Sequence, residues 1–170
     1  VPEPEEAAEL YELLHRGTPG DVEWYIEQLR GARRVLELGV GWGRILAALA
    51  EALPEAELVG LELDPALLGR ARAGLPGRVR LVEADMRAPP PLGALLPGGS
   101  GFDAVLAPYS ALWCLGSDAE VLSTLRAARA RLAPGGRLLL DAYAADGFHA
   151  YAEPEPGDDD PCFLAELWFG

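Results

Sequence analysis

The chain has 170 residues, half of them hydrophobic, and carries a net charge of −13 at pH 7. That length suits one domain with a sizeable core, and the apolar runs are far too short to span a bilayer. Because phosphate backbones bind basic surfaces, the acidic balance disfavours nucleic acid as a partner.

Several residue types that define enzyme classes are missing or sparse. The sequence contains no lysine, which excludes both the Schiff-base lysine of pyridoxal phosphate enzymes and the lysine of a P-loop. The two cysteines, Cys114 and Cys162, lie far apart, so we expect no metal site and no disulfide framework. Residues 1–6 are acidic and unlike a signal peptide, and we therefore expect a cytoplasmic protein.

Two helices are predicted at the start of the chain. Apolar residues recur at helical spacing over residues 4–16, which indicates the first helix. The Thr-Pro-Gly-Asp sequence at residues 18–21 resembles an N-cap followed by proline at the first helical position. It predicts that the second helix begins there and ends near Arg30.

From residue 33 onward, short apolar runs alternate with amphipathic segments. The predicted strands cover residues 34–39, 58–63, 79–83, 102–107 and 137–142. The predicted helices between them cover residues 45–53, 65–74 and 118–132. A capping box from Ser117 to Glu120 begins the last helix, and the Pro-Gly-Gly at residues 134–136 is predicted to turn the chain into the fifth strand. Residues 87–101 are predicted to form a loop with one short helical turn.

This alternation predicts the α/β class, with a three-layer, Rossmann-like open parallel sheet and helices on both faces. We expect one domain over residues 1–170. Its parts are the N-terminal helices (1–31), the core (32–142), and an acidic loop with a C-terminal strand (143–170). The apolar strand at its end has no evident partner, so the C-terminal strands are expected to be incomplete unless this strand pairs with another segment.

The first candidate cluster for ligand binding, Glu37-x-Gly39-x-Gly41-x-Gly43, follows the first strand, and open parallel sheets bind ligands at that end of their strands. Glycines let the backbone approach a ligand closely. The spacing differs from the GxGxxG of dinucleotide folds, because Arg44 stands where the third glycine would be. With the negative charge of Glu37, this favours an amino-acid-like ligand over a pyrophosphate. A plain tight turn is the alternative.

Acidic residues follow the second and third strands. Glu62 lies about 20 residues after the glycines, where an acid binds ribose hydroxyls in dinucleotide folds. The rival acid, Asp64, is expected to cap the helix that begins at Pro65. Asp85 can accept a hydrogen bond from an adenine amino group, and Met86 offers apolar surface to the ring. A solvated turn is the alternative role of Asp85.

The fourth cluster, residues 107–110, follows the fourth strand, where the reacting end of a ligand is expected. Tyr109 is a candidate to line the pocket or to form a hydrogen bond with an acceptor. The alternative is an aromatic ring packed under the following helix.

In this order, the four clusters resemble class I S-adenosylmethionine-dependent methyltransferases. The glycine cluster matches their first motif, Glu62 their ribose-binding acid and Asp85 their adenine-binding acid. The Leu-Ala-Pro-Gly-Gly at residues 132–136 resembles the turn before their fifth strand. The resemblance covers roughly residues 10–142 and implies S-adenosylmethionine as the cofactor.

Residues 103–115 are similar to a subgroup that includes small-molecule and amino-sugar N-methyltransferases. The acidic motif that follows strand four in DNA and protein amide methyltransferases is absent. The resemblance implies further cofactor contacts from Tyr11, Leu63 and Ala107. The substrate-pocket residues that it implies are Tyr109, Ser110, Trp113 and Tyr143.

The implied reaction is in-line transfer of a methyl group to nitrogen or oxygen of a small-molecule acceptor. A neutral amine needs no strong base, but a hydroxyl acceptor needs one, which Tyr143 or His149 could supply. The catalytic candidates are therefore Tyr109 and His149, and His15 is favoured less than His149.

Two alternatives of other classes stay open. One is an NAD(P)-dependent oxidoreductase, against which the GxGxG spacing and Asp85 both argue. The other is a non-catalytic methyltransferase-like module that binds the cofactor or a partner chain. A homodimer is a further open alternative.

Overall fold

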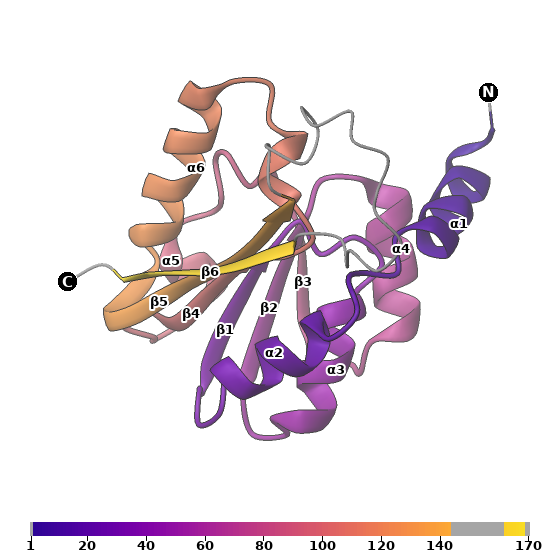
Figure 1. Ribbon diagram of the computed structural model, residues 1–170. Coiled ribbons are helices and arrows are strands. Elements are labelled where there is room, and N and C mark those ends of the chain that lie inside the picture. The colour runs from indigo at the N-terminus through magenta and orange to yellow at the C-terminus, as the bar shows by residue number, and fades with distance from the viewer. Residues whose placement is uncertain (1, 144–161, 169–170) are drawn as a thin grey trace, which may run out of the picture.

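In the computed structural model, which describes residues 2–143 and 162–168, six strands form one open sheet in the order β3-β2-β1-β4-β5-β6 (Figure 1). The strands are β1 Arg34–Leu38, β2 Glu57–Glu62, β3 Arg80–Glu83, β4 Phe102–Ala107, β5 Leu132–Tyr143 and β6 Cys162–Trp168. Strands β1 to β5 are parallel, whereas β6 is antiparallel to β5. The strand order reverses between β1 and β4, which is where open α/β sheets bind ligands.

Helices cover both faces of this sheet (Figure 1). They are α1 Pro4–Leu14, α2 Asp21–Gln28, α3 Arg44–Ala52, α4 Pro65–Gly74, α5 Leu92–Leu95 and α6 Asp118–Arg129, with a 3₁₀ turn at Ala111–Cys114. Side chains from α2, α3 and α4 form one core cluster with the sheet, and side chains from α5 and α6 form the other. The predicted three-layer α/β architecture is therefore confirmed.

Alternate residues of each central strand enter the two core clusters, because side chains alternate across a pleated sheet. In β1, Val35 belongs to one cluster, whereas Leu36 and Leu38 belong to the other. Both faces are apolar because helices exclude water from both. Glu37 interrupts the pattern as a carboxyl that is only 2% exposed, on the same face as Val35.

A glycine outside the predicted motifs allows α3 to pack closely on the sheet. A Cβ atom on Gly60 of β2 would lie 2.4 Å from Val40 Cγ2 and 2.7 Å from Leu46 Cδ1. Real Cβ atoms do not approach other heavy atoms so closely, so glycine is required while these side chains keep their positions. The start of α3 is thereby held against β2.

The prediction that proline begins the second helix is wrong. Helix α2 begins at Asp21, and its N-cap is Gly20, whose φ of 85° is left-handed. A helix cannot continue through a residue in that conformation, so Pro19 lies outside it. The Asp21 carboxylate instead accepts a hydrogen bond from the N–H of Thr18 at 3.1 Å.

The predicted turn into the fifth strand is also wrong. Strand β5 begins at Leu132, before the Pro-Gly-Gly at residues 134–136. Its register against β4 shifts between the pair Phe102–Leu132 and the pair Ala104–Arg137, so these residues form a bulge within the strand. The preceding helix therefore ends at Arg129, earlier than expected.

The capping box is formed only in part. Ser117 Oγ accepts a hydrogen bond from the Glu120 N–H at 3.3 Å, as predicted. The Glu120 carboxylate, however, accepts from the N–H of Gly116 instead of Ser117. The other oxygen of that carboxylate is engaged by Arg87, which holds the side chain away from the arrangement of a full box.

The C-terminal strand has the partner that the sequence did not reveal. Strand β6 pairs with β5 along its length, from Tyr143 opposite Cys162 to Arg137 opposite Trp168. His149 and the acidic stretch at residues 152–161 lie outside the described residues. None of the described helices is both long and apolar enough to cross a bilayer.

Candidate active site

A cavity of about 540 Å³, here called the strand-end cavity, lies at the carboxyl ends of β1 to β4. Its walls come from α1 and from the loops that follow these four strands. The predicted cofactor residues that line it are Tyr11, Glu37, Gly39, Gly41, Glu62, Leu63, Asp85 and Met86. Four clusters that are separate in the sequence are therefore brought together, as the order of the motifs predicted.

Two predicted cofactor residues do not line the strand-end cavity. Gly43 is the N-cap of α3, and a Cβ atom on it would lie 2.9 Å from Leu75 Cδ1, so it allows α3 to pack beside the end of α4. Ala107 ends β4 and is 1% exposed within the core. Both residues shape the fold around the site.

Residues 39–43, the glycine turn, form the floor beside β1. Gly39 and Gly41 have φ values of 70° and 59°, a left-handed conformation that favours glycine. A Cβ atom on Gly41 would lie 3.5 Å from Tyr11 Cε1, which places the aromatic ring of α1 directly over the turn.

Glu37 presents an incompletely paired carboxyl to the strand-end cavity. Among the described residues, its Oε2 atom has no hydrogen-bond partner, although the side chain is 2% exposed. Burial raises its pKa well above the usual value of 4.5, with Arg44 opposing the rise and nearby Glu62 and Asp141 adding to it. Buried polar atoms rarely lack partners, so this oxygen is suited to a cationic group of a ligand.

The Glu62 carboxylate connects the loops after β1 and β2. One oxygen accepts the Gly41 N–H at 2.7 Å, and the other accepts the N–H groups of Leu63 and Asp64 at 2.8 and 2.9 Å. Asp64 has the capping role that the sequence predicted, since its side chain accepts from the N–H groups of Ala66 and Leu67.

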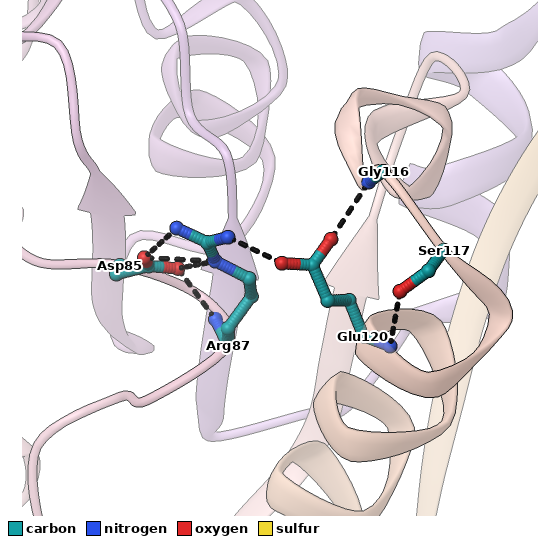
Figure 2. A network of polar contacts seen from close by, with 5 residues as sticks. All are labelled: Asp85, Arg87, Gly116, Ser117 and Glu120. Atoms are coloured by element: carbon teal, nitrogen blue, oxygen red, sulfur yellow. Dashed lines mark hydrogen bonds and ion pairs between the residues drawn. The ribbon is translucent and has the colours of Figure 1, made fainter.

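Figure 2 shows Arg87 between Asp85, on the loop after β3, and Glu120, in the first turn of α6. Both ion pairs have N–O distances of 2.6 Å. Hydrogen bonds from Arg87 hold the pKa of each carboxyl below its usual value. Asp85, the predicted acceptor for the adenine amino group, is thus already paired with Arg87. Local sequence patterns did not indicate this pairing.

Arg44, which the motif spacing identifies only as an obstacle to pyrophosphate, also faces the strand-end cavity. It forms two parallel hydrogen bonds with Asp21, at 2.8 and 2.6 Å, and the Asp21 side chain is 3% exposed. Its guanidinium carbon lies 5.9 Å from the centre of the Tyr109 ring. The bidentate geometry fixes a positive charge beside the glycine turn.

The chain after β4 adopts a conformation that few residues tolerate. Tyr109 and Ser110 have φ values of 51° and 57°, and such strain concentrates at functional sites. The Asp141 carboxylate accepts the Tyr109 N–H at 2.7 Å, and the Asp141 carbonyl accepts the Ser110 N–H at 3.0 Å. Asp141 also accepts the buried Tyr25 hydroxyl at 2.7 Å, and burial raises its pKa.

The predicted substrate-pocket residues separate in space. Tyr109 lines the strand-end cavity, but Ser110 and Trp113 do not, and Trp113 is 50% exposed. Tyr143 is the last residue of β5. His149, the other predicted catalytic candidate, lies outside the described residues.

Helix α1 closes the strand-end cavity with two stacked rings. Tyr11 and His15 have ring centres 3.9 Å apart and an interplanar angle of 11°. His15 meets the Tyr109 ring edge to face at 5.9 Å. An ion pair between Glu12 and Arg70 joins α1 to α4. From the sequence, His149 is favoured over His15 as a catalytic residue.

The model of a methyltransferase domain family matches residues 36–138. The chain is 35% identical over 131 residues to protein-L-isoaspartate O-methyltransferase 1 of Anaeromyxobacter sp., covering 77% of this chain and 56% of the relative. It is 32% identical over 145 residues to demethylmenaquinone methyltransferase of Thermus thermophilus, covering 79% of this chain and 61% of that relative.

Among solved structures, the chain is similar to CalS10, an amino pentose methyltransferase of Micromonospora echinaspora solved with S-adenosylmethionine bound. The TM-score is 0.64 and the identity 35%, over 82% of this chain and 56% of CalS10. The chain thus spans between half and two thirds of the length of these relatives. Because the family model covers more than half of its residues, the chain belongs to the methyltransferase domain family.

Proposed function

We propose that the chain binds S-adenosylmethionine in the strand-end cavity and transfers its methyl group to nitrogen or oxygen of a small-molecule acceptor. The observation that carries this proposal is the buried Glu37 carboxyl beside the glycine turn, one oxygen of which has no partner among the described residues. An ammonium group would pair with that oxygen and offset the cost of burying it. A pyrophosphate has no cationic group to offer and would leave that oxygen unpaired.

The amino-acid end of the cofactor fits the charges around the glycine turn. Glu37 offers a carboxyl to the ammonium group, and Arg44 offers a cation to the carboxylate from the same cavity. Because Asp21 holds Arg44 in a bidentate pair, the guanidinium needs little reorganisation to bind. A carboxyl and a guanidinium in one cavity suit the zwitterionic amino-acid end of the cofactor.

The adenosine end of the cofactor fits Glu62, Met86 and Asp85, although Asp85 is also paired with Arg87. A carboxylate has about four lone-pair sites, and Glu62 uses three of them for backbone N–H groups. It therefore has room for one ribose hydroxyl. Recognition of the adenine amino group by Asp85 requires Arg87 to share that carboxylate, and Arg87 also lines the cavity.

The cofactor, when bound, supplies the electrophilic methyl group. The residues of this chain hold it at the sheet edge, cover it with α1 and exclude water, and such alignment can lower a barrier by about 7–11 kcal/mol at best. A small acceptor, in place of nucleic acid, is consistent with the net charge of −13. An amine acceptor is supported by the similarity to an amino pentose methyltransferase.

Ligand-induced stabilisation tests the proposal. Melting of the purified chain is measured with S-adenosylmethionine, S-adenosylhomocysteine and NADH. A ligand that binds only the native state stabilises it by about 2.7 kcal/mol at 100 times its Kd. We expect stabilisation by the two adenosyl sulfur ligands alone. Stabilisation by NADH alone would instead favour the oxidoreductase.

Two matched variants locate the binding site. Glu37→Gln removes the negative charge from the strand-end cavity and is expected to weaken binding of both adenosyl ligands. Glu51→Gln makes the same change at an exposed position on α3 and is expected to leave binding unchanged. Equal affinities in the two variants would contradict the assignment of Glu37.

A further inference from the structure

His15 has a hydrogen bond that determines which of its ring nitrogens carries the proton. Its Nδ1 atom lies 3.0 Å from the carbonyl oxygen of Tyr11. A carbonyl oxygen can only accept a hydrogen bond, so Nδ1 must be the donor. In the neutral ring, Nε2 is then left with a free lone pair.

That lone pair belongs to a ring on the wall of the strand-end cavity. His15 lines this cavity, and no hydrogen bond to its Nε2 is found among the described residues. The ring is held on one side by the Tyr11 stack and on another by the edge of Tyr109. Trp42 Nε1 donates to the His15 carbonyl at 3.3 Å and fixes the backbone.

The position is also the one at which a reacting group is expected. His15 contacts Tyr109, which follows β4, while Tyr11 covers the glycine turn that follows β1. Two acidic groups near this position are already engaged. Asp141 holds the Tyr109 N–H and the Tyr25 hydroxyl, and Asp85 holds Arg87.

We propose that His15 Nε2 accepts the proton that the methyl acceptor loses, which identifies the acceptor as a compound with an N–H or O–H group at the reacting atom. This inference rests on the proposed methyl transfer. The acceptor lone pair forms the bond to the methyl carbon, and the carbon–sulfur bond breaks with its electron pair kept by sulfur. The acceptor proton passes to Nε2. The positive charge leaves the sulfonium and appears on the imidazolium, so the charge balances.

Sinefungin provides a binding test that does not require the acceptor to be known. This analogue of the cofactor carries an amine where the cofactor carries its methyl group, so the amine stands where His15 is inferred to act. S-adenosylhomocysteine lacks that amine. Titration calorimetry with both ligands therefore separates contact with the reacting position from general binding of the cofactor.

The variant for this test is His15→Phe, which keeps an aromatic ring on Tyr11 and removes the nitrogen. Because a hydrogen bond to a charged group is lost, we expect the affinity for sinefungin to fall about tenfold or more. We expect the affinity for S-adenosylhomocysteine to change less than about twofold, since it makes no such bond. Retained affinity for S-adenosylhomocysteine also shows that the variant is folded.

Several outcomes would overturn the inference. Unchanged sinefungin affinity in His15→Phe, or an equal loss for both ligands, would mean that His15 lines the cavity without contacting the reacting position. A selective loss in His149→Phe, the matched change at the second histidine, would assign the role to that residue. If neither ligand bound the unaltered protein, the proposed function itself would fail.

A spectroscopic measurement tests the tautomer independently of any ligand. The chain has two histidines, so ¹⁵N spectra of the imidazoles are simple, and His15→Phe assigns them. We expect a protonated Nδ1 and an unprotonated Nε2 in neutral His15. The opposite tautomer would overturn the inference.

Discussion

Replacing Glu37 with glutamine is expected to stabilise the ligand-free protein while it weakens cofactor binding. The carboxyl is buried, and its Oε2 atom has no partner among the described residues. An unpaired buried acceptor costs about 1–3 kcal/mol, and more when it is charged. Glutamine has the same shape and stays neutral, so it removes the cost of ionising a buried carboxyl, and we expect a gain of at least about 1 kcal/mol at pH 7.

The sign of the pH dependence follows from the direction of the pKa shift. Burial raises the pKa of Glu37 above its usual value of 4.5, so the folded state holds the proton more tightly than the unfolded state. The contribution of Glu37 to folding stability is fully favourable below pH 4.5 and is lost as pH rises through the pKa of the folded state. The stability gain from Glu37→Gln is therefore expected to grow from pH 4.5 upward.

Urea denaturation of both proteins across this pH range measures the difference, and other titrating groups cancel in the comparison. Calorimetry with S-adenosylhomocysteine at the same pH values measures binding. A variant that is less stable than the parent by a constant amount at every pH would refute the reasoning. So would a stabilised variant with unchanged affinity, because the unpaired carboxyl would then have no role toward the ligand.

Three further predictions concern the framework of the site. Gly60→Ala is expected to cost about 1–3 kcal/mol in urea denaturation because the added methyl overlaps Val40, whereas Gly69→Ala on α4, which meets nothing within 4 Å, should stabilise. Asp141→Ala should cost roughly 2–4 kcal/mol, since two donors lose their acceptor, and Asp141→Asn clearly less. Arg87→Ala should return the pKa of Asp85 upward toward 3.8, measured by carboxyl ¹³C NMR; an unchanged pKa would contradict the pairing.

Local sequence patterns were sufficient to predict the parallel part of the sheet and the order of its ligand-binding loops. Apolar runs such as residues 104–107 lie within the observed strand β4, because a parallel strand covered by helices on both faces is mostly apolar. Asp64 before proline predicted its cap correctly, since capping involves only the next few residues. The carboxyl ends of parallel strands share one edge, so Glu37, Glu62 and Asp85 had to converge.

Contacts between distant residues were decided by the tertiary structure alone. Tyr25 and Asp141 are 116 positions apart, and neither has a neighbour in sequence that indicates the other. The same holds for the partners of Arg44 and Gly60, which depend on how helices pack on the sheet, and for β6, which pairs with the distant strand β5. His15 is the clearest case: periodicity places it at the end of a helix, but only the packing of α1 over the glycine turn brings its ring beside Tyr109.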